Sequence, residues 1–205
     1  KYDTDRLALI ITQTGGGCRA TNYIGFIRRA LEKAGYAHIP VISLNLGGIE
    51  TNPGFKLDAD LGLRICLAGQ LGDIFMRCVY RMRPYEAVPG SVNAMHQKWL
   101  KVAIEYVSAK KVNLAKFPSL CKQIIKDFDN IEILDIKKPR VGIVGEILVK
   151  FSPAGNNYLV DLLESEGAEA VVPELVGFIL YCFYNQIYKA EHLGTSKKAA
   201  RNSKL

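Results

Sequence analysis

The sequence predicts an α/β protein built on a Rossmann- or flavodoxin-like parallel sheet, with a helical insertion in the middle. Two segments, 7–49 and 139–173, each follow the order strand, loop, helix, strand. Between them, the apolar residues of 58–128 recur at helical spacing. Parallel strands need a crossover, usually a helix, so repeated strand–helix–strand segments indicate a parallel sheet. The expected parts are a βαβ unit (1–57), a helical insertion (58–138), a second βα unit (139–188) and a basic C-terminal tail (189–205).

The first βαβ unit is expected to open with a short apolar strand over Leu7–Thr12. A run of glycines follows and leads into a helix predicted over about 21–35. The apolar positions of this helix are Ile24, Ile27, Leu31 and Ala34. A second strand is predicted over Pro40–Leu44, and a loop rich in glycine, asparagine and proline comes after it.

The middle of the chain predicts three successive helices without an intervening strand. The first runs from residue 58 to Pro84, with its apolar stripe at Leu63, Leu67, Leu71, Ile74, Cys78 and Met82. The second is expected over Ser91–Lys111 and the third over about Pro118–Phe128. Such a run favours an insertion or a helical cap on the sheet.

The second βα unit begins after Pro139 with a predicted strand over Val141–Gly145. A helix follows over about Asn156–Glu166, where Asn156 is a suitable capping residue and Gly167 a suitable stop. The next strand is Ala168–Pro173, and an aromatic-rich helix is expected over Gly177–Tyr188.

Charge and cysteine usage indicate a soluble protein of a reducing cytoplasm. The net charge is +7, but no nucleic-acid-binding motif accompanies the basic residues, so nucleic acid is not expected as a partner. A solvated basic face is the first interpretation, and an anionic partner the second.

No apolar run is long enough for a membrane span. The five cysteines form no C-x-x-C pair. Because residue 1 is lysine, we expect a fragment or a processed chain.

The most reactive position predicted from the sequence is a glycine–cysteine turn, Gly15-Gly16-Gly17-Cys18-Arg19. Glycines let the backbone approach a ligand closely, and a helix start offers free N–H groups. A thiol placed there, beside arginine, is expected to ionise readily. The turn could therefore hold a nucleophile or a metal-ligating thiolate. A phosphate loop is disfavoured because no Gly-Lys-Ser/Thr ending follows.

A nucleophile at Cys18 would need a nearby histidine. The chain offers only His38, His96 and His192, and His38 leads into the amino end of the second strand.

Cys18 is expected at the carboxyl edge of the parallel sheet, where sheets of this kind bind their ligands. Cys182 and Glu146 also follow strand ends, so they are expected at the same edge. For the loop that carries Glu146, helix capping is the simpler interpretation. Core positions are expected for Cys66, Cys78 and Cys121.

Two stretches, Thr12–Tyr23 and Pro139–Lys150, resemble signature segments of a known family. It comprises large bacterial proteins related to 2-hydroxyacyl-CoA dehydratases and their ATP-dependent activases. The resemblance extends through Asn156–Val172 and Pro173–Asn185 and so covers most of the chain. In that family, an activase module hydrolyses ATP and passes an electron from its iron–sulfur cluster to a dehydratase-like module, which has its own cysteine-ligated cluster.

The chain resembles the dehydratase-like portion, which is built from flavodoxin-like α/β units. The resemblance implies an iron–sulfur cluster, expected as [4Fe–4S], with Cys18 as one ligand and Cys182 as a second. It gives the amides of Gly15–Gly17 and the charge of Arg19 a part in tuning the cluster. It also implies an ATPase activase module as partner and an acyl-CoA-type substrate.

Such clusters usually need at least three cysteine ligands. We therefore expect an empty or incomplete site in this chain, with the missing ligands upstream of Lys1 or in a partner module. Two other functions remain open: a cysteine-nucleophile hydrolase or transferase, and a non-catalytic module that docks the ATPase partner through its basic helices.

Overall fold

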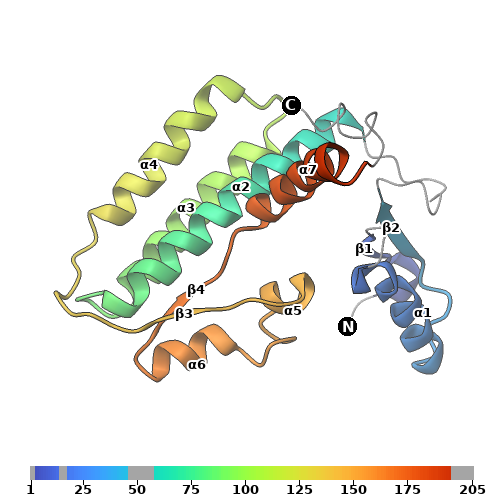
Figure 1. Cartoon of the computed structure of the whole chain (residues 1–205), viewed down its shortest axis with the longest axis horizontal. Helices are drawn as coiled ribbons and strands as arrows, with labels where there is room; N and C mark the ends of the chain where they lie inside the picture. Colours follow the sequence, from blue (N-terminus) through green and yellow to red (C-terminus); the bar gives the residue numbers. More distant parts are fainter. Residues whose placement is uncertain (1–2, 14–17, 46–57, 195–205) are drawn as a thin grey trace. The chain divides into compact units, whose positions relative to one another are not determined.

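The computed structural model describes residues 3–13, 18–45 and 58–194, and the chain divides into two compact units. We call Lys1–Asp58 the N-terminal unit and Ala59–Leu205 the C-terminal unit. Figure 1 shows their helices and strands in sequence colours. Each unit has its own strand pair, so the two are described separately.

The N-terminal unit is the predicted βαβ unit. Strands β1 (Leu9–Gln13) and β2 (Val41–Asn45) pair in parallel, with Leu9 opposite Val41 and Gln13 opposite Asn45. Helix α1 (Tyr23–Lys33) forms the crossover, and short 3-10 helices precede β1 and α1 at η1 (Thr4–Arg6) and η2 (Arg19–Thr21). Helix α1 buries Ile24. The parallel pairing predicted for this segment is confirmed.

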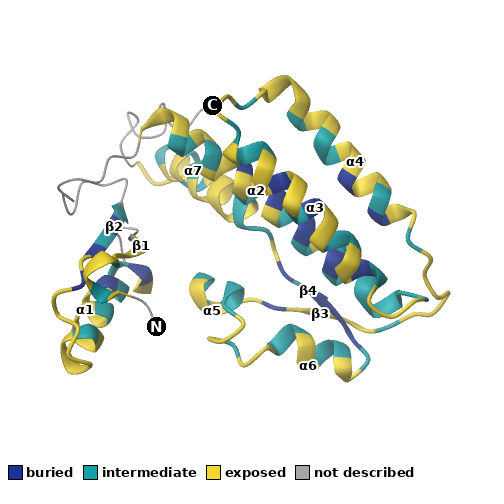
Figure 2. Ribbon diagram, turned by 180° about the vertical axis from the view of Figure 1, so that it is seen from behind, coloured by how far each residue is buried: buried dark blue, intermediate teal, exposed yellow. Residues whose placement is uncertain are grey.

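Three helices in the C-terminal unit enclose the main hydrophobic core. They are α2 (Ala59–Met82), α3 (Ser91–Ser108) and α4 (Phe117–Asp129), joined by η3 (Arg83–Tyr85) and η4 (Leu114–Lys116). Figure 2 shows buried positions where these helices face one another. The fully or nearly buried residues of this core are Leu71, Phe75, Val79, Val92, Trp99, Ala103, Ile124 and Phe128.

The second strand pair lies in the same unit. Strands β3 (Arg140–Gly142) and β4 (Glu169–Val171) run parallel. Three helices follow the predicted order: α5 (Ile147–Phe151), α6 (Leu159–Ser165) and α7 (Leu175–His192). Strand β4 contacts both α2 and α6, and α7 lies against α2 (Figure 1). A smaller core of Ile143, Ala170 and Val172 joins the strands to these helices.

The structure confirms a mixed α/β protein with parallel strand pairs, but not one continuous sheet. Among the described residues, the strands form two separate two-stranded sheets. Strand β3 is also shorter than predicted, since it ends at Gly142 and not at Gly145. Helix α7 continues to His192, and residues 195–205 of the predicted tail lie outside the described residues. No helix in the described ranges is long and apolar enough to cross a membrane.

Candidate functional site

One buried side chain, Gln13, makes hydrogen bonds that link the carboxyl end of β1 to β2 and to the turn before α1. Its Nε2 donates to the carbonyl oxygen of Thr21 at 3.0 Å, and its Oε1 accepts from Ser43 Oγ at 2.7 Å. Gln13 and Ser43 are both buried. Since buried amides need partners, these bonds fix the strand ends and the turn into α1 relative to one another. Gln13 thus positions the segment that carries Cys18.

Cys18 stands at the start of that turn, and it is exposed. Its backbone is extended (φ −101°, ψ 146°), and its carbonyl oxygen accepts from the N–H of Thr21 at 3.1 Å. The neighbouring Arg19 is exposed too. Cys18 precedes the one-turn helix η2, and α1 begins only at Tyr23, so the thiol does not occupy the first turn of α1. Gly15, Gly16 and Gly17 lie outside the described residues.

Cys182 belongs to the other unit, where it lies exposed within α7. Within the described ranges, no three His, Cys, Asp or Glu side chains are grouped closely enough to hold a metal ion. Cys18 and Cys182 are thus exposed thiols of two different units, and the described residues do not group a complete set of metal ligands around either.

The other cysteines divide between core and surface. Cys78 and Cys121 are partly buried against the helical core, as predicted. Burial raises the pKa of the Cys78 thiol to about 11, and Asp129 adds to this effect while Arg77 opposes it. The prediction for Cys66 is wrong, because this residue is exposed. The buried face of α2 passes through Leu67 and Leu71, and Cys66 lies about 100° away from Leu67 around the helix.

Glu146 caps a short helix that the sequence pattern did not predict. Its Oε2 accepts from the N–H of Val149 at 2.9 Å at the start of α5. Helix α6 begins at Leu159, three residues later than predicted, and its N-cap position is Tyr158; Asn156 Oδ1 still accepts from the N–H of Leu159 at 3.2 Å. Gly167 follows α6 with a φ of 85°, which glycine adopts readily. Contacts with helix N–H groups therefore account for Glu146 Oε2 and for Asn156 Oδ1.

The sequence analysis missed a buried carboxylate, Glu169, the first residue of β4. Glu169 is only 1% exposed. Its Oε2 accepts from Arg81 Nη1 at 2.7 Å and from the Tyr85 hydroxyl at 2.8 Å, and its Oε1 accepts from Arg140 Nε at 3.0 Å. Burial alone would raise the pKa of Glu169, but the bonds from Arg81 and Tyr85 and the charge of Arg140 hold it below its usual value.

The available signal was a glutamate inside an apolar strand, Ala168-Glu169-Ala170. A charged residue at such a position is almost never fully buried without a partner. The strand register supplies one partner directly, because Arg140 lies opposite Glu169. The other partners come from the end of α2 and from η3.

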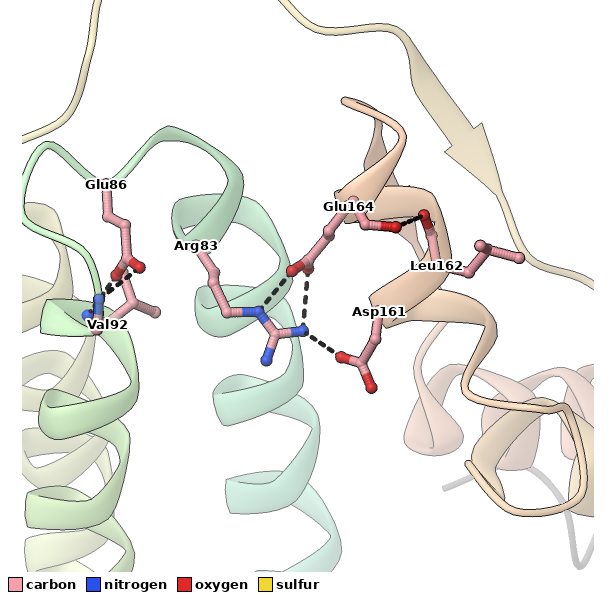
Figure 3. Close-up of polar contacts among 8 residues, drawn as sticks. Arg83, Glu86, Val92, Asp161, Leu162 and Glu164 are labelled. Carbon is pink, nitrogen blue, oxygen red and sulfur yellow. Dashed lines mark hydrogen bonds and ion pairs between the residues drawn. The ribbon is translucent and has the colours of Figure 1, made fainter.

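Arg77 and Arg81 are mostly exposed, as a solvated basic face predicts, but they and Arg83 also pair with acids of the second βα unit. Arg83 binds Glu164 through Nε at 2.6 Å and Nη2 at 3.0 Å, and its Nη2 also contacts Asp161 at 3.3 Å (Figure 3). Arg77 Nη1 binds Glu174 Oε1 at 2.6 Å. Together with the Arg81–Glu169 pair, these ion pairs join α2 and η3 to the segment from α6 to α7.

The chain was compared with protein-family models, curated proteins and solved structures. None of them matches.

Proposed function

We propose that this chain is the cluster-binding, electron-accepting module of an iron–sulfur, ATP-dependent electron-transfer system related to 2-hydroxyacyl-CoA dehydratase and its activase. The resemblance of Thr12–Tyr23 and Pro139–Lys150 supports the family. The observation that carries the site is the anchoring of the Cys18 turn by Gln13 at the carboxyl end of a parallel strand pair.

In this proposal Cys18 is one thiolate ligand and Cys182 a second, and the remaining ligands come from a partner module. An exposed thiol on a fixed turn suits a ligand, because metal clusters are held by thiolates. Arg19 and the amides of Gly15–Gly17 would offset the negative charge of the cluster. The cluster, when bound, would supply one-electron chemistry, at a potential set by charge and hydrogen bonds around it. The proposed partner is an ATPase activase module, the substrate class is an acyl-CoA, and the compartment is the cytoplasm.

The geometry of the N-terminal unit favours a ligand over a nucleophile. The histidine of this unit, His38, lies before β2 at the amino end of the strand pair, and its Nε2 is 3.8 Å from Asp5 Oδ1. Cys18 follows the opposite, carboxyl end of β1. A general base must come within hydrogen-bond reach of the proton that it removes. His38 is therefore a poor base for Cys18.

The test is anaerobic reconstitution of the chain with iron and sulfide, followed by iron analysis, EPR and absorbance near about 400 nm. We expect substoichiometric iron that falls to background in Cys18→Ala. Cys66→Ala is the matched control, since Cys66 is also exposed, and it should keep the wild-type iron content. Equal iron content in Cys18→Ala and wild type would overturn the ligand role. A stable, stoichiometric cluster in the chain alone would overturn the shared ligand set.

A further inference from the structure

Two arginines of the C-terminal unit are held in place by one buried carboxylate. Arg81 and Arg140 each direct one N–H to Glu169, at 2.7 and 3.0 Å. Their side chains nevertheless remain 60% and 62% exposed, against 2% for Glu169. A guanidinium has five N–H donors, so each arginine keeps donors directed at solvent. Glu169 therefore orients two cationic groups without covering them.

These arginines border a surface cavity of about 470 Å³. Lys137 and Lys138 also line it, so four cationic side chains face two carboxylates, Asp135 and Glu169. The cavity thus carries an excess of two positive charges. That excess matches a phosphate group, which carries close to two negative charges at neutral pH.

The remaining wall of this cavity is apolar and open to solvent. Ile133, Leu134 and Ile136 contribute to the wall and are 49%, 48% and 47% exposed. Met82, the last residue of α2, and Tyr85 of η3 also belong to this wall. An apolar wall beside a few convergent polar groups is typical of small-molecule sites.

We propose that this cavity binds a small molecule that has a phosphate group and a flat or apolar body. The phosphate would accept hydrogen bonds from Arg81 and Arg140, because a guanidinium group can donate two parallel N–H bonds to phosphate oxygens. Lys137 and Lys138 would neutralise its charge. The apolar body would cover Ile133, Leu134 and Ile136. The site lies within the C-terminal unit and is independent of Cys18, so its test and the cluster test fail separately.

The test is isothermal titration calorimetry of the full chain at low salt with three probes: AMP, adenosine and inorganic phosphate. We expect saturable binding of AMP, weaker binding of inorganic phosphate by about 10-fold, and no binding of adenosine. The variant Lys137→Gln/Lys138→Gln should weaken AMP binding by about 10-fold. It leaves every bond to Glu169 in place, so folding is expected to be unaffected.

The matched control is Lys110→Gln/Lys111→Gln, which removes two adjacent exposed lysines after α3. It makes the same change in net charge and should leave AMP affinity unchanged within about 2-fold. Absence of saturable AMP binding would overturn the proposal. So would equal weakening by the two double variants, because that result would reflect net charge alone.

Discussion

Asp73, in the middle of α2, caps the start of α7 through Leu175. Its Oδ1 accepts from the N–H of Leu175 at 2.9 Å, and its Oδ2 accepts from the N–H of Val176 at 2.8 Å. The first N–H groups of a helix have no partner within the helix. One carboxylate from a distant helix satisfies two of them here and holds α7 against α2.

Replacing Asp73 with Ala should therefore loosen α7. Loss of a helix cap costs about 1–2 kcal/mol, and two N–H groups lose their partner in this variant. We expect the free energy of unfolding to fall by about that amount, with faster hydrogen exchange at the amides of Leu175 and Val176. Urea denaturation and exchange measured by mass spectrometry check both effects.

The matched control for this change is Asp60→Ala, on the same helix. Asp60 is exposed and pairs with Arg64 one turn away, at 2.7 Å. Such pairs contribute about 0.3–0.5 kcal/mol, so exchange in α7 should stay as in the wild type. Similar exchange at Leu175 in both variants would contradict the capping role of Asp73.

Glu169 predicts a dependence of stability on pH. Because its pKa in the folded chain lies below the ordinary value of 4.5, the folded state favours the ionised form. That contribution is present above about pH 4.5 and is lost as the pH falls through the folded pKa. Glu169→Gln should lower the free energy of unfolding by about 2 kcal/mol near neutral pH. The difference from the wild type should shrink in acid.

Urea titrations at about pH 7 and about pH 3.5 measure this difference. Glu174→Gln is the control, since Glu174 binds Arg77 in a far more exposed pair. Its effect should stay below about 1 kcal/mol at both pH values. A pH-independent loss in Glu169→Gln would show that packing, not charge, is responsible.

The partly buried thiol of Cys78 should resist alkylation. A pKa near 11 instead of 9.0 lowers its thiolate fraction about 100-fold at neutral pH, and the thiolate is the reacting form. We expect iodoacetamide to label Cys66 and Cys182, which are exposed, at least about 10-fold faster, because the greater nucleophilicity of a high-pKa thiolate offsets part of the lost ionisation. Peptide mass spectrometry gives each rate. In urea the rates should converge, and a rapid reaction of Cys78 in the folded chain would contradict its burial.

Among the described residues, local periodicity predicted every α-helix except α5, whose five residues are too few to show a helical repeat. It was less accurate for α2, whose predicted stripe passed through Ile74 and Cys78, whereas the buried residues include Phe75 and Val79. Helix α2 contacts α3 and α4 but also β4 and α7, so apolar residues occur on more than one face. A hydrophobic pattern does not show which of two apolar faces is the more deeply buried.

The ion pairs of the C-terminal unit could not be found from local sequence. The partners of Arg77, Arg81 and Arg83 lie 97, 88 and 81 residues away. In the sequence these arginines resemble a solvated helix face, because spacing along one helix says nothing about a distant segment. Gln13 lies within Thr12–Tyr23, but only the folded structure shows that its side chain joins Ser43 to Thr21.

The buried position of Glu169 also has an entropic consequence for Arg81 and Arg140. A free arginine side chain on a protein surface samples many rotamers, and fixing it completely costs about 2 kcal/mol. Glu169 restricts both side chains when the chain folds, before any other molecule arrives. An anion that meets these two groups therefore loses less of its binding free energy to side-chain ordering than it would at two freely rotating arginines.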